Sequence, residues 1–305
     1  MVSPFKISIQ VPNYEKQGRY FSFRLHSDAG NEPCEFKMPR GLFVVSDIEG
    51  NFVSFFKLLI AAGVINPALD WVFGEGHLVI LGDCFDRGEQ VTECLWLIYS
   101  LEEKAKRVGG HVHFILGNHE IMNMNGDWRY VHPRYAIETI PSQDPPAALY
   151  HANDELWKWL QTKNIIEKIG SWLFVHAGIS RELINLKLNI REMNELARPW
   201  YCRAEEAEQE TQALSVLFGP NTSPFWYRGY YLEVADMELI KETLFFYKAK
   251  AIITGHTMIS RITPFFKNRV ININTDHSKD ISEGLMITRK GFYRVISNGE
   301  MEKIL

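Results

Sequence analysis

Several short apolar segments of this chain end abruptly in polar residues, and this pattern constrains the fold more than any other feature. Residues 41–47 (GLFVVSD) and 77–83 (HLVILGD) are the first two, and each is followed by apolar residues at helical spacing. Residues 111–116 form a third segment, after which the chain reads GNHE. Strands that alternate with helices are typical of α/β domains, which bind ligands where their strands end. We therefore expect an α/β fold with its chemistry at one edge of a sheet.

The rest of the chain predicts further elements and a division into parts. Helices are expected at residues 51–62, 90–108, 153–160 and 237–247, and strands at 165–169, 172–175, 251–254, 270–274, 285–288 and 292–296. Residues 1–40 alternate in character, which predicts an N-terminal β extension packed on a main body of residues 41–305. Within that body, residues 181–235 are expected to form an inserted cap of helices and loops.

Composition and charge exclude several classes of protein. The 305 residues are 46% hydrophobic and 23% charged, which is typical of a folded globular chain rather than a disordered one. A net charge of −4 provides no broad basic surface, so neither nucleic acid nor a membrane is an expected partner. The cysteines form no CxxC pair, and neither a signal peptide nor a membrane-spanning run is visible. We expect a cytoplasmic, monomeric protein without disulfides.

The polar residues at the predicted strand ends share one chemistry. They are Asp47, Glu49, Asp83, Asn118, His176 and His256. Carboxylates, imidazoles and a carboxamide are the ligands of hard and borderline divalent cations. Taken alone, the Asp-x-Glu pair is as consistent with a solvated turn, and each histidine with a satisfied core position. Their joint occurrence, each directly after a buried strand, favours a metal centre.

These motifs resemble those of the calcineurin-like metallophosphoesterases, and within that family the phosphoprotein-phosphatase group. The family pattern is GDxHG, GDxxDRG, GNHE, HGG and GHT, and this chain reads SDIEG, GDCFDRG, GNHE, HAG and GHT. The segment SPFWYRG at 223–229 is similar to the SPxWxRG segment of bacterial-type and Shewanella-like protein phosphatases. The resemblance covers roughly Gly41 to Thr257. It implies a four-layer αββα sandwich with two mixed central sheets.

The resemblance also implies a centre of two divalent metal ions. Asp47 and Glu49 would hold the first ion, and Asp83 would bridge the two. The coordination of the second ion would be completed by Asn118, His176 and His256. Two cations held about 3.5–4 Å apart can share a water and lower its pKa towards neutrality, and the resulting bridging hydroxide would attack phosphorus.

The same resemblance assigns roles beside the metals. His119 would be the general acid for the leaving oxygen, and Asp86 would orient it by a charge-assisted hydrogen bond. Arg87 and Arg228, together with Asn118, would bind the phosphate, because a guanidinium fork fits its oxygens and stays charged.

Glu49 departs from the family pattern, which has histidine at that position. A carboxylate makes the first metal site harder and more negative, which favours Mn²⁺ or Mg²⁺. We therefore expect two Mn²⁺ ions, with Fe, Zn and Mg as the other candidates. Exchange of Glu49 for histidine should shift the preference towards Fe or Zn.

The implied reaction is hydrolysis of a phosphomonoester, carried by a phosphorylated protein or peptide or by a small phosphoester. One alternative is a symmetrical dinucleoside-tetraphosphate hydrolase, or another phosphoanhydride or phosphodiester hydrolase, which the same motifs can serve. A non-enzymatic alternative is a phosphate-binding pseudophosphatase, which predicts loss of ligands or of the acid. Phosphoserine, phosphothreonine and phosphotyrosine are not separated by the sequence, and the insertion at 181–235 is expected to decide among them.

Overall fold

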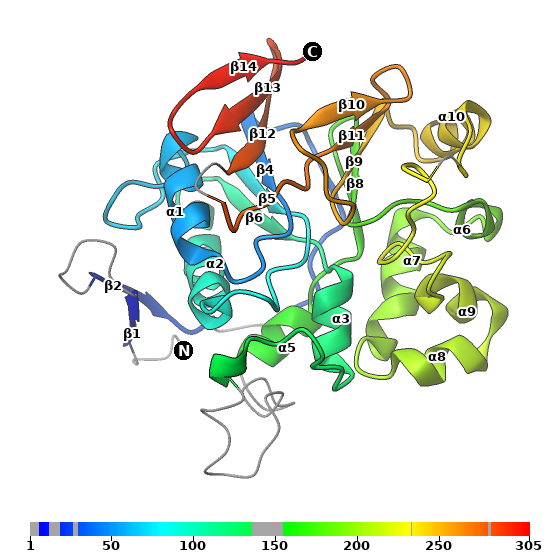
Figure 1. The fold of residues 1–305 in the computed structure, drawn as a ribbon, viewed down its shortest axis with the longest axis horizontal. Coiled ribbons are helices and arrows are strands. Elements are labelled where there is room, and N and C mark those ends of the chain that lie inside the picture. Colours follow the sequence, from blue (N-terminus) through cyan, green and yellow to red (C-terminus); the bar gives the residue numbers. More distant parts are fainter. Residues whose placement is uncertain (1–5, 12–18, 27–29, 136–154, 233, 280–281) are drawn as a thin grey trace.

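The chain folds around two six-stranded sheets that pack face to face (Figure 1). The computed structural model describes residues 6–11, 19–26, 30–135, 155–232, 234–279 and 282–305. The first sheet has the strand order β14-β13-β12-β4-β5-β6, and the second has the order β10-β11-β9-β8-β7-β3. Both sheets contain parallel and antiparallel neighbours, so both are mixed, as the resemblance implied.

The first sheet has a parallel half and an antiparallel half. Its parallel strands are β4 (Gly41–Val45), β5 (His77–Ile80) and β6 (His111–Phe114). Its antiparallel strands are β12 (Glu283–Thr288), β13 (Gly291–Ile296) and β14 (Met301–Lys303). Helices α1 (Phe52–Ala61) and α2 (Val91–Lys106) connect the parallel strands, as right-handed crossover units require.

The second sheet collects strands from widely separated parts of the chain. They are β3 (Glu35–Phe36), β7 (Ile166–Ile169), β8 (Trp172–Val175), β9 (Ala251–Thr254), β10 (Thr263–Phe265) and β11 (Val270–Asn272). β7 and β8 form the predicted antiparallel hairpin, and β9 runs parallel to β8 and to β11. Strands β3, β10 and β14 were not predicted, because two or three residues are too few to show a period.

Successive side chains of a strand point to opposite faces of its sheet and therefore pack into different layers. Leu42 and Val44 of β4 belong to the apolar cluster between the sheets, together with Phe174 and Ile253 of the second sheet. Phe43, one position along β4, belongs instead to the cluster that includes α1 and α2. Figure 1 shows α1 and α2 on the left, the two sheets in the middle, and the later helices on the right. The expected four-layer αββα sandwich is therefore confirmed.

The second helical layer comes mostly from the stretch predicted as an insertion. It contains α6 (Arg181–Asn185), α7 (Ile190–Ala197), a short 3-10 helix η3 (Arg198–Trp200), α8 (Ala204–Glu210), α9 (Gln212–Phe218) and α10 (Met237–Phe246). Two further helices, α3 (Asn118–Met124) and α5 (Glu155–Gln161), lie in the chain between β6 of the first sheet and β7 of the second. The start of the helix predicted at 153–160 lies outside the described residues. No helix in the described part of the chain is long and apolar enough to cross a bilayer.

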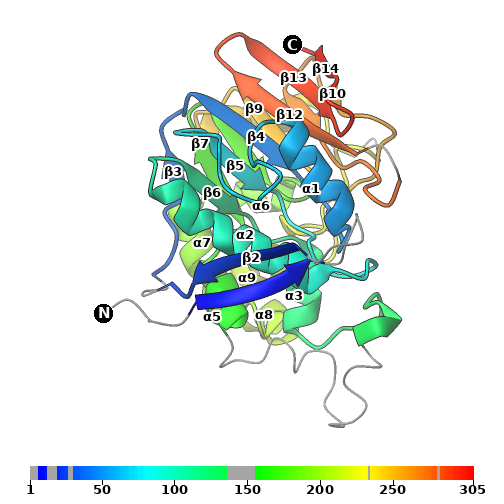
Figure 2. The ribbon, with the colours of Figure 1, turned by 90° about the vertical axis from the view of Figure 1, so that its left-hand side faces the viewer.

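An antiparallel hairpin of β1 (Lys6–Val11) and β2 (Arg19–Arg24) lies against α2 (Figure 2). Phe23 of this hairpin stacks on Trp96 and contacts Tyr99, with ring centroids 5.1 and 5.5 Å apart. β3 comes from the same N-terminal stretch but pairs with β7 in the second sheet. The division of the chain at residue 40 stays a prediction.

Candidate active site

The loops after β4, β5, β6, β8 and β9 carry the predicted ligands, and backbone hydrogen bonds hold these loops together. The amide of Asp47 donates to the carbonyl of Gly82 at 2.9 Å, which joins the loops after β4 and β5. The amide of Gly255 donates to the carbonyl of His176 at 2.7 Å, which joins those after β8 and β9. The amide of His256 donates to Oδ2 of Asp47 at 3.1 Å, so the two sheets meet at the site.

The backbone at the predicted site residues adopts an uncommon conformation. Asp47, Glu49, Asp83 and His256 have φ angles of 53°, 48°, 56° and 63°. Such left-handed values are unfavourable for residues other than glycine and cluster at functional sites. Here they turn the backbone within a few residues of each strand end. The surrounding hydrogen bonds hold the chain in these turns.

Two glycines permit close approach around the same side chains. A Cβ atom at Gly117 would collide with Oδ1 of Asp83, and one at Gly255 would collide with Oγ of Ser46. The motif glycines at these positions are therefore required by the lack of space for a side chain.

Three predicted ligands converge on one point. Asp83, His176 and His256 are all buried, and each offers a ligand atom within 4.8 Å of the others. Asn118 joins them, because its Oδ1 lies 3.0 Å from Nε2 of His176. These residues follow β5, β6, β8 and β9 in the chain, so the cluster exists only because both sheets bring their strand ends together.

The environment of His176 tests whether a cation fits. Its Nδ1–H donates to the carbonyl of Leu81 at 2.7 Å, and its Nε2 lies 3.1 Å from Oδ2 of Asp83. Burial alone would lower the pKa of His176, but the charge of Asp83 raises it to about 9. Without a cation the ring is therefore protonated on both nitrogens, and its Nε2–H faces Oδ2 of Asp83. A divalent cation would neutralise the same oxygens with a neutral imidazole as ligand, so the donor set fits a metal ion.

His256 supplies a second observation. Its Nε2 is buried and has no hydrogen-bond partner among the described residues. Burial, reinforced by the nearby His176, holds the pKa of His256 well below its usual value, so the ring is neutral. A buried lone pair without a partner is costly unless something binds it, and it points to a ligand role.

Asp47 and Glu49 have different surroundings. Asp47 accepts hydrogen bonds from the side-chain amide of Asn274 at 2.9 Å and from the hydroxyl of Ser46. Burial raises the pKa of Asp47 to about 6, against the lowering effect of His176. The carboxylate of Glu49 forms an ion pair with Arg87 instead of joining the convergent cluster. The structure thus groups Asp83, His176, His256 and Asn118 and leaves Glu49 facing a guanidinium.

The predicted acid and its partner are in contact. Nδ1 of His119 donates to Oδ2 of Asp86 at 2.5 Å, and the side-chain amide of Asn123 donates to Oδ1 of Asp86 at 2.9 Å. Burial lowers the pKa of His119, but the carboxylates of Asp83 and Asp86 outweigh burial and raise it. His119 is therefore oriented with Nε2 free to donate a proton, 3.9 Å from Oδ2 of Asp83.

Two arginines and an aromatic ring lie on the solvent side. Arg87 is half-exposed, and its guanidinium lies 5.6 Å from the ring centroid of Tyr130. Arg228 donates to the carbonyl of His256 at 3.2 Å. Tyr130 is 45% exposed, with its ring 5.5 Å from that of His119, so an accessible aromatic side chain borders the acid.

Several contributors were missed from the sequence. Glu120, quoted only as part of GNHE, accepts hydrogen bonds from the amides of Asp83, Cys84 and Gly117 at 2.9, 2.7 and 2.7 Å. It therefore fixes the loop that carries Asp83. Its place in the motif was a usable signal, whereas Asn123, Tyr130 and Asn274 gave none.

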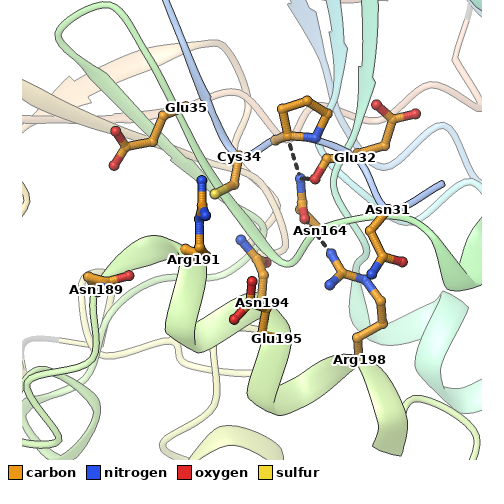
Figure 3. A pocket seen from close by; sticks show the side chains of 11 residues that line it. Asn31, Glu32, Cys34, Glu35, Asn164, Asn189, Arg191, Asn194, Glu195 and Arg198 are labelled. Atoms are coloured by element: carbon orange, nitrogen blue, oxygen red, sulfur yellow. Dashed lines mark hydrogen bonds between the residues drawn. The ribbon is translucent and has the colours of Figure 1, made fainter.

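A separate polar cavity of about 510 Å³ lies between residues 31–35 and α7 (Figure 3). None of the predicted ligands lines it. Its buried amides are already engaged, since Asn194 accepts from the amide of Ile165 at 2.8 Å and Asn164 accepts from Arg198 at 2.7 Å. The convergent cluster is the stronger candidate for chemistry.

Comparisons with known proteins give matches over most of the chain. The family model described as calcineurin-like phosphoesterase matches residues 42–260. An uncharacterized protein of Schizosaccharomyces pombe is 30% identical over 81% of this chain and 76% of its own length. Shewanella-like protein phosphatase 2 of Arabidopsis thaliana is 25% identical over 88% of this chain and 80% of its own. The crystal structure of a cold-active protein-tyrosine phosphatase from a psychrophilic Shewanella species superposes with a TM-score of 0.89 at 34% identity, covering 97% of this chain and 90% of that one.

Proposed function

The chain belongs to the calcineurin-like phosphoesterase family and is a phosphatase, and on that basis we propose that it removes phosphate from phosphorylated proteins with two divalent metal ions. The observation that carries the proposal is the convergence of Asp83, His176 and His256, with the hydrogen-bonded pair of His119 and Asp86 beside them. This combination supplies a cation site and a proton donor in one place.

The donor set supports the following assignment of metal ligands. Asp83, Asn118, His176 and His256 would hold one ion, and Asp47 and Glu49, with Asp83 shared, would hold the other. Two bound cations supply Lewis-acid activation of a water and neutralise charge on the phosphoryl group. The oxygen-rich site of Asp47, Glu49 and the shared Asp83 favours Mn²⁺ over softer ions.

The residues of the chain then account for binding and proton transfer. Arg87 would exchange its ion pair with Glu49 for the phosphate oxygens, and Arg228 would bind them from the side of His256. A hydroxide, formed when a water loses a proton to solvent, would attack phosphorus opposite the leaving oxygen, and the bond from phosphorus to that oxygen would break. His119 donates its Nε2 proton to the departing oxygen, and Asp86 keeps the ring aligned as its positive charge is lost.

Two observations support a protein substrate. Two of the proteins that match most of this chain bear the names of protein phosphatases, one of them a protein-tyrosine phosphatase. Tyr130 also places an accessible ring beside His119, where the aryl group of a phosphotyrosine would leave.

A substrate panel tests the proposal. Purified protein with Mn²⁺ is assayed for phosphate release from one peptide phosphorylated on tyrosine, serine or threonine, from diadenosine tetraphosphate and from a bis-aryl phosphodiester. We expect the phosphopeptides to be the best substrates. Preference for the dinucleotide would support the tetraphosphatase alternative instead, and phosphopeptide binding without hydrolysis would support a pseudophosphatase.

A matched pair of variants tests the site. Asp83→Asn should abolish both turnover and the binding of two Mn²⁺ ions measured by titration calorimetry. Asp70→Asn removes an exposed carboxylate that pairs with Lys104 and is not among the assigned ligands, and it should change neither. Full metal binding by Asp83→Asn would contradict the assigned ligands.

A further inference from the structure

A cavity of about 780 Å³ opens next to the candidate site, and the proposed function does not use it. Its apolar lining comes from Met258, Ile259 and Ile296, and its charged lining includes Asp276, Lys279 and Arg294. Met258 is 58% exposed although it is a large apolar side chain. An exposed apolar surface in a concavity beside a catalytic centre is a usual place for part of a ligand.

The cavity walls are continuous with the candidate site. One wall is the loop after β9, which begins at His256 and reaches Met258 two residues later. The other wall follows β11 and begins at Asn274, whose side chain holds Asp47 at 2.9 Å. The amide of Ile259 donates to the carbonyl of Asn274 at 2.9 Å, so the two walls are fixed to each other.

The phosphate-binding end of the site adjoins the same walls. Nη1 of Arg228 contacts the carbonyl of His256 and, at 3.4 Å, Oγ1 of Thr257. Met258 is the next residue, and consecutive Cα atoms lie about 3.8 Å apart. A peptide substrate whose phosphate is bound by Arg228 therefore has to cross only one or two residues of this loop to reach the cavity.

The charges around the cavity compensate one another. Lys279 forms an ion pair with Asp276 at 3.1 Å, and Arg294 forms one with Glu283 at 2.7 Å. Among the described residues that line it, the cavity thus presents no net charge to a ligand. A second phosphate, as in a dinucleotide, would find both of these cations already paired, whereas an apolar side chain would be desolvated against Met258, Ile259 and Ile296.

We propose that this cavity binds an apolar side chain of the phosphorylated peptide, close in sequence to the residue that carries the phosphate. The inference rests on the proposed function, because it names the part of the substrate that lies beside the reacting group. Methionine suits this task, since its flexible and polarisable side chain adapts to differently shaped apolar groups.

The test compares peptides that differ at one position. A phosphopeptide series carries leucine or aspartate at each position flanking the phosphorylated residue, and 4-nitrophenyl phosphate serves as a substrate too small to reach the cavity. At one flanking position we expect the leucine peptide to have about a 10-fold or larger advantage in kcat/KM, in the range that a buried apolar group provides.

Two variants identify the surface responsible. Met258→Asp places a carboxylate in the cavity and should remove the leucine advantage, mainly through KM. Met301→Asp makes the same change at a methionine that is 55% exposed on β14 and does not line the cavity, and it should keep the advantage. Both variants should hydrolyse 4-nitrophenyl phosphate within about twofold of the parent, which also verifies their folding.

The outcomes separate the two proposals. Equal rates for leucine and aspartate peptides at every position, or the same loss in both variants, would overturn the cavity assignment while leaving the phosphatase in place. Failure to hydrolyse 4-nitrophenyl phosphate and all phosphopeptides would overturn the proposed function, and the peptide assignment would fall with it.

Discussion

The side-chain amide of Asn274 donates a hydrogen bond to Oδ1 of Asp47 at 2.9 Å, although the two residues are 227 positions apart in the chain. Because the other oxygen of Asp47 accepts the amide of His256, this carboxylate is held from two directions. We expect Asn274→Ala to weaken Mn²⁺ binding by about 10–100-fold, as loss of a group that orients a ligand commonly does. Titration calorimetry measures this, with exposed Asn221→Ala as the control. Unchanged affinity would argue against Asp47 as a ligand.

The contact between His119 and Asp86 predicts a dependence on the leaving group. His119→Asn removes the proton donor, which should slow hydrolysis of a phosphoserine peptide by about 10²–10⁴-fold. A 4-nitrophenolate leaves without needing a proton, so the same variant should lose far less activity on 4-nitrophenyl phosphate. Comparison of kcat on the two substrates measures the effect. An equal loss on both would mean that His119 acts by positioning alone.

Removal of Arg228 should weaken substrate binding and also slow the reaction. Arg228→Ala should lower kcat/KM by about 10²–10³-fold, because charge on the phosphate persists in the transition state. Arg228→Lys keeps the charge without the planar fork and should lie between parent and alanine. Arg40→Ala, at an exposed arginine paired with Glu75, is the control in steady-state assays. Parent-like kinetics in Arg228→Ala would remove this residue from the site.

Glu49 predicts a metal preference. Its carboxylate now pairs with Arg87, and as a ligand it would make its site harder than a histidine would. Glu49→His should therefore bind Zn²⁺ or Fe²⁺ more tightly relative to Mn²⁺ than the parent does. Competition titrations with the three ions, read as bound metal by atomic absorption, give the order. The same order in both proteins would disprove the effect of this carboxylate.

A buried network away from the site predicts a pH dependence of stability. Glu167 contacts Nδ1 of His113 at 2.7 Å and accepts from Asn164 at 2.9 Å. Burial raises the pKa of Glu167 from 4.5 to about 8, and burial lowers that of His113 to about 3. The folded state therefore holds a neutral carboxyl that donates to a neutral imidazole, which in turn reaches His77 at 2.9 Å.

The sign of this dependence follows from proton release. Between pH 4.5 and about 8 the folded chain keeps the Glu167 proton and the unfolded chain loses it. The contribution of Glu167 to stability should fall as the pH rises through this range, by up to about 1.4 kcal/mol per unit. Below pH 6.5 the lowered pKa of His113 acts in the opposite direction, so the net fall is expected between pH 6.5 and about 8. Glu167→Gln copies the protonated form and should lack this slope in urea unfolding curves, whereas exposed Glu195→Gln should keep it. If Glu167→Gln kept this dependence of the unfolding free energy on pH, the titrating group would be one other than Glu167.

The sequence predicted the framework well because long apolar runs and motif residues coincide. β4 and β5 were found from runs such as GLFVV, and α1, α2 and α10 from apolar spacing, with ends within a few residues. The helix beginning at Asn118 was missed, because its first turn consists of motif residues that carry no helical pattern.

Sequence reasoning named candidate site residues but not the contacts between them. Asp83, His176 and His256 meet as expected, because strand ends of packed sheets converge. Asn274 was given no role, since no local pattern reveals a hydrogen bond across 227 residues. The pairing of Glu49 with Arg87 depends on side-chain packing that spacing does not encode. The metal assignments and the cap at 181–235 stay predictions.

The left-handed turns at Asp47, Asp83 and His256 have a practical consequence. Hydrogen bonds between the loops fix the backbone of these turns, so the fold of both sheets sets where the three side chains lie. On the proposed function, one purified batch could be stripped by a chelator and refilled with different metals in turn. Differences among those preparations would report the chemistry of each element rather than a rearranged scaffold.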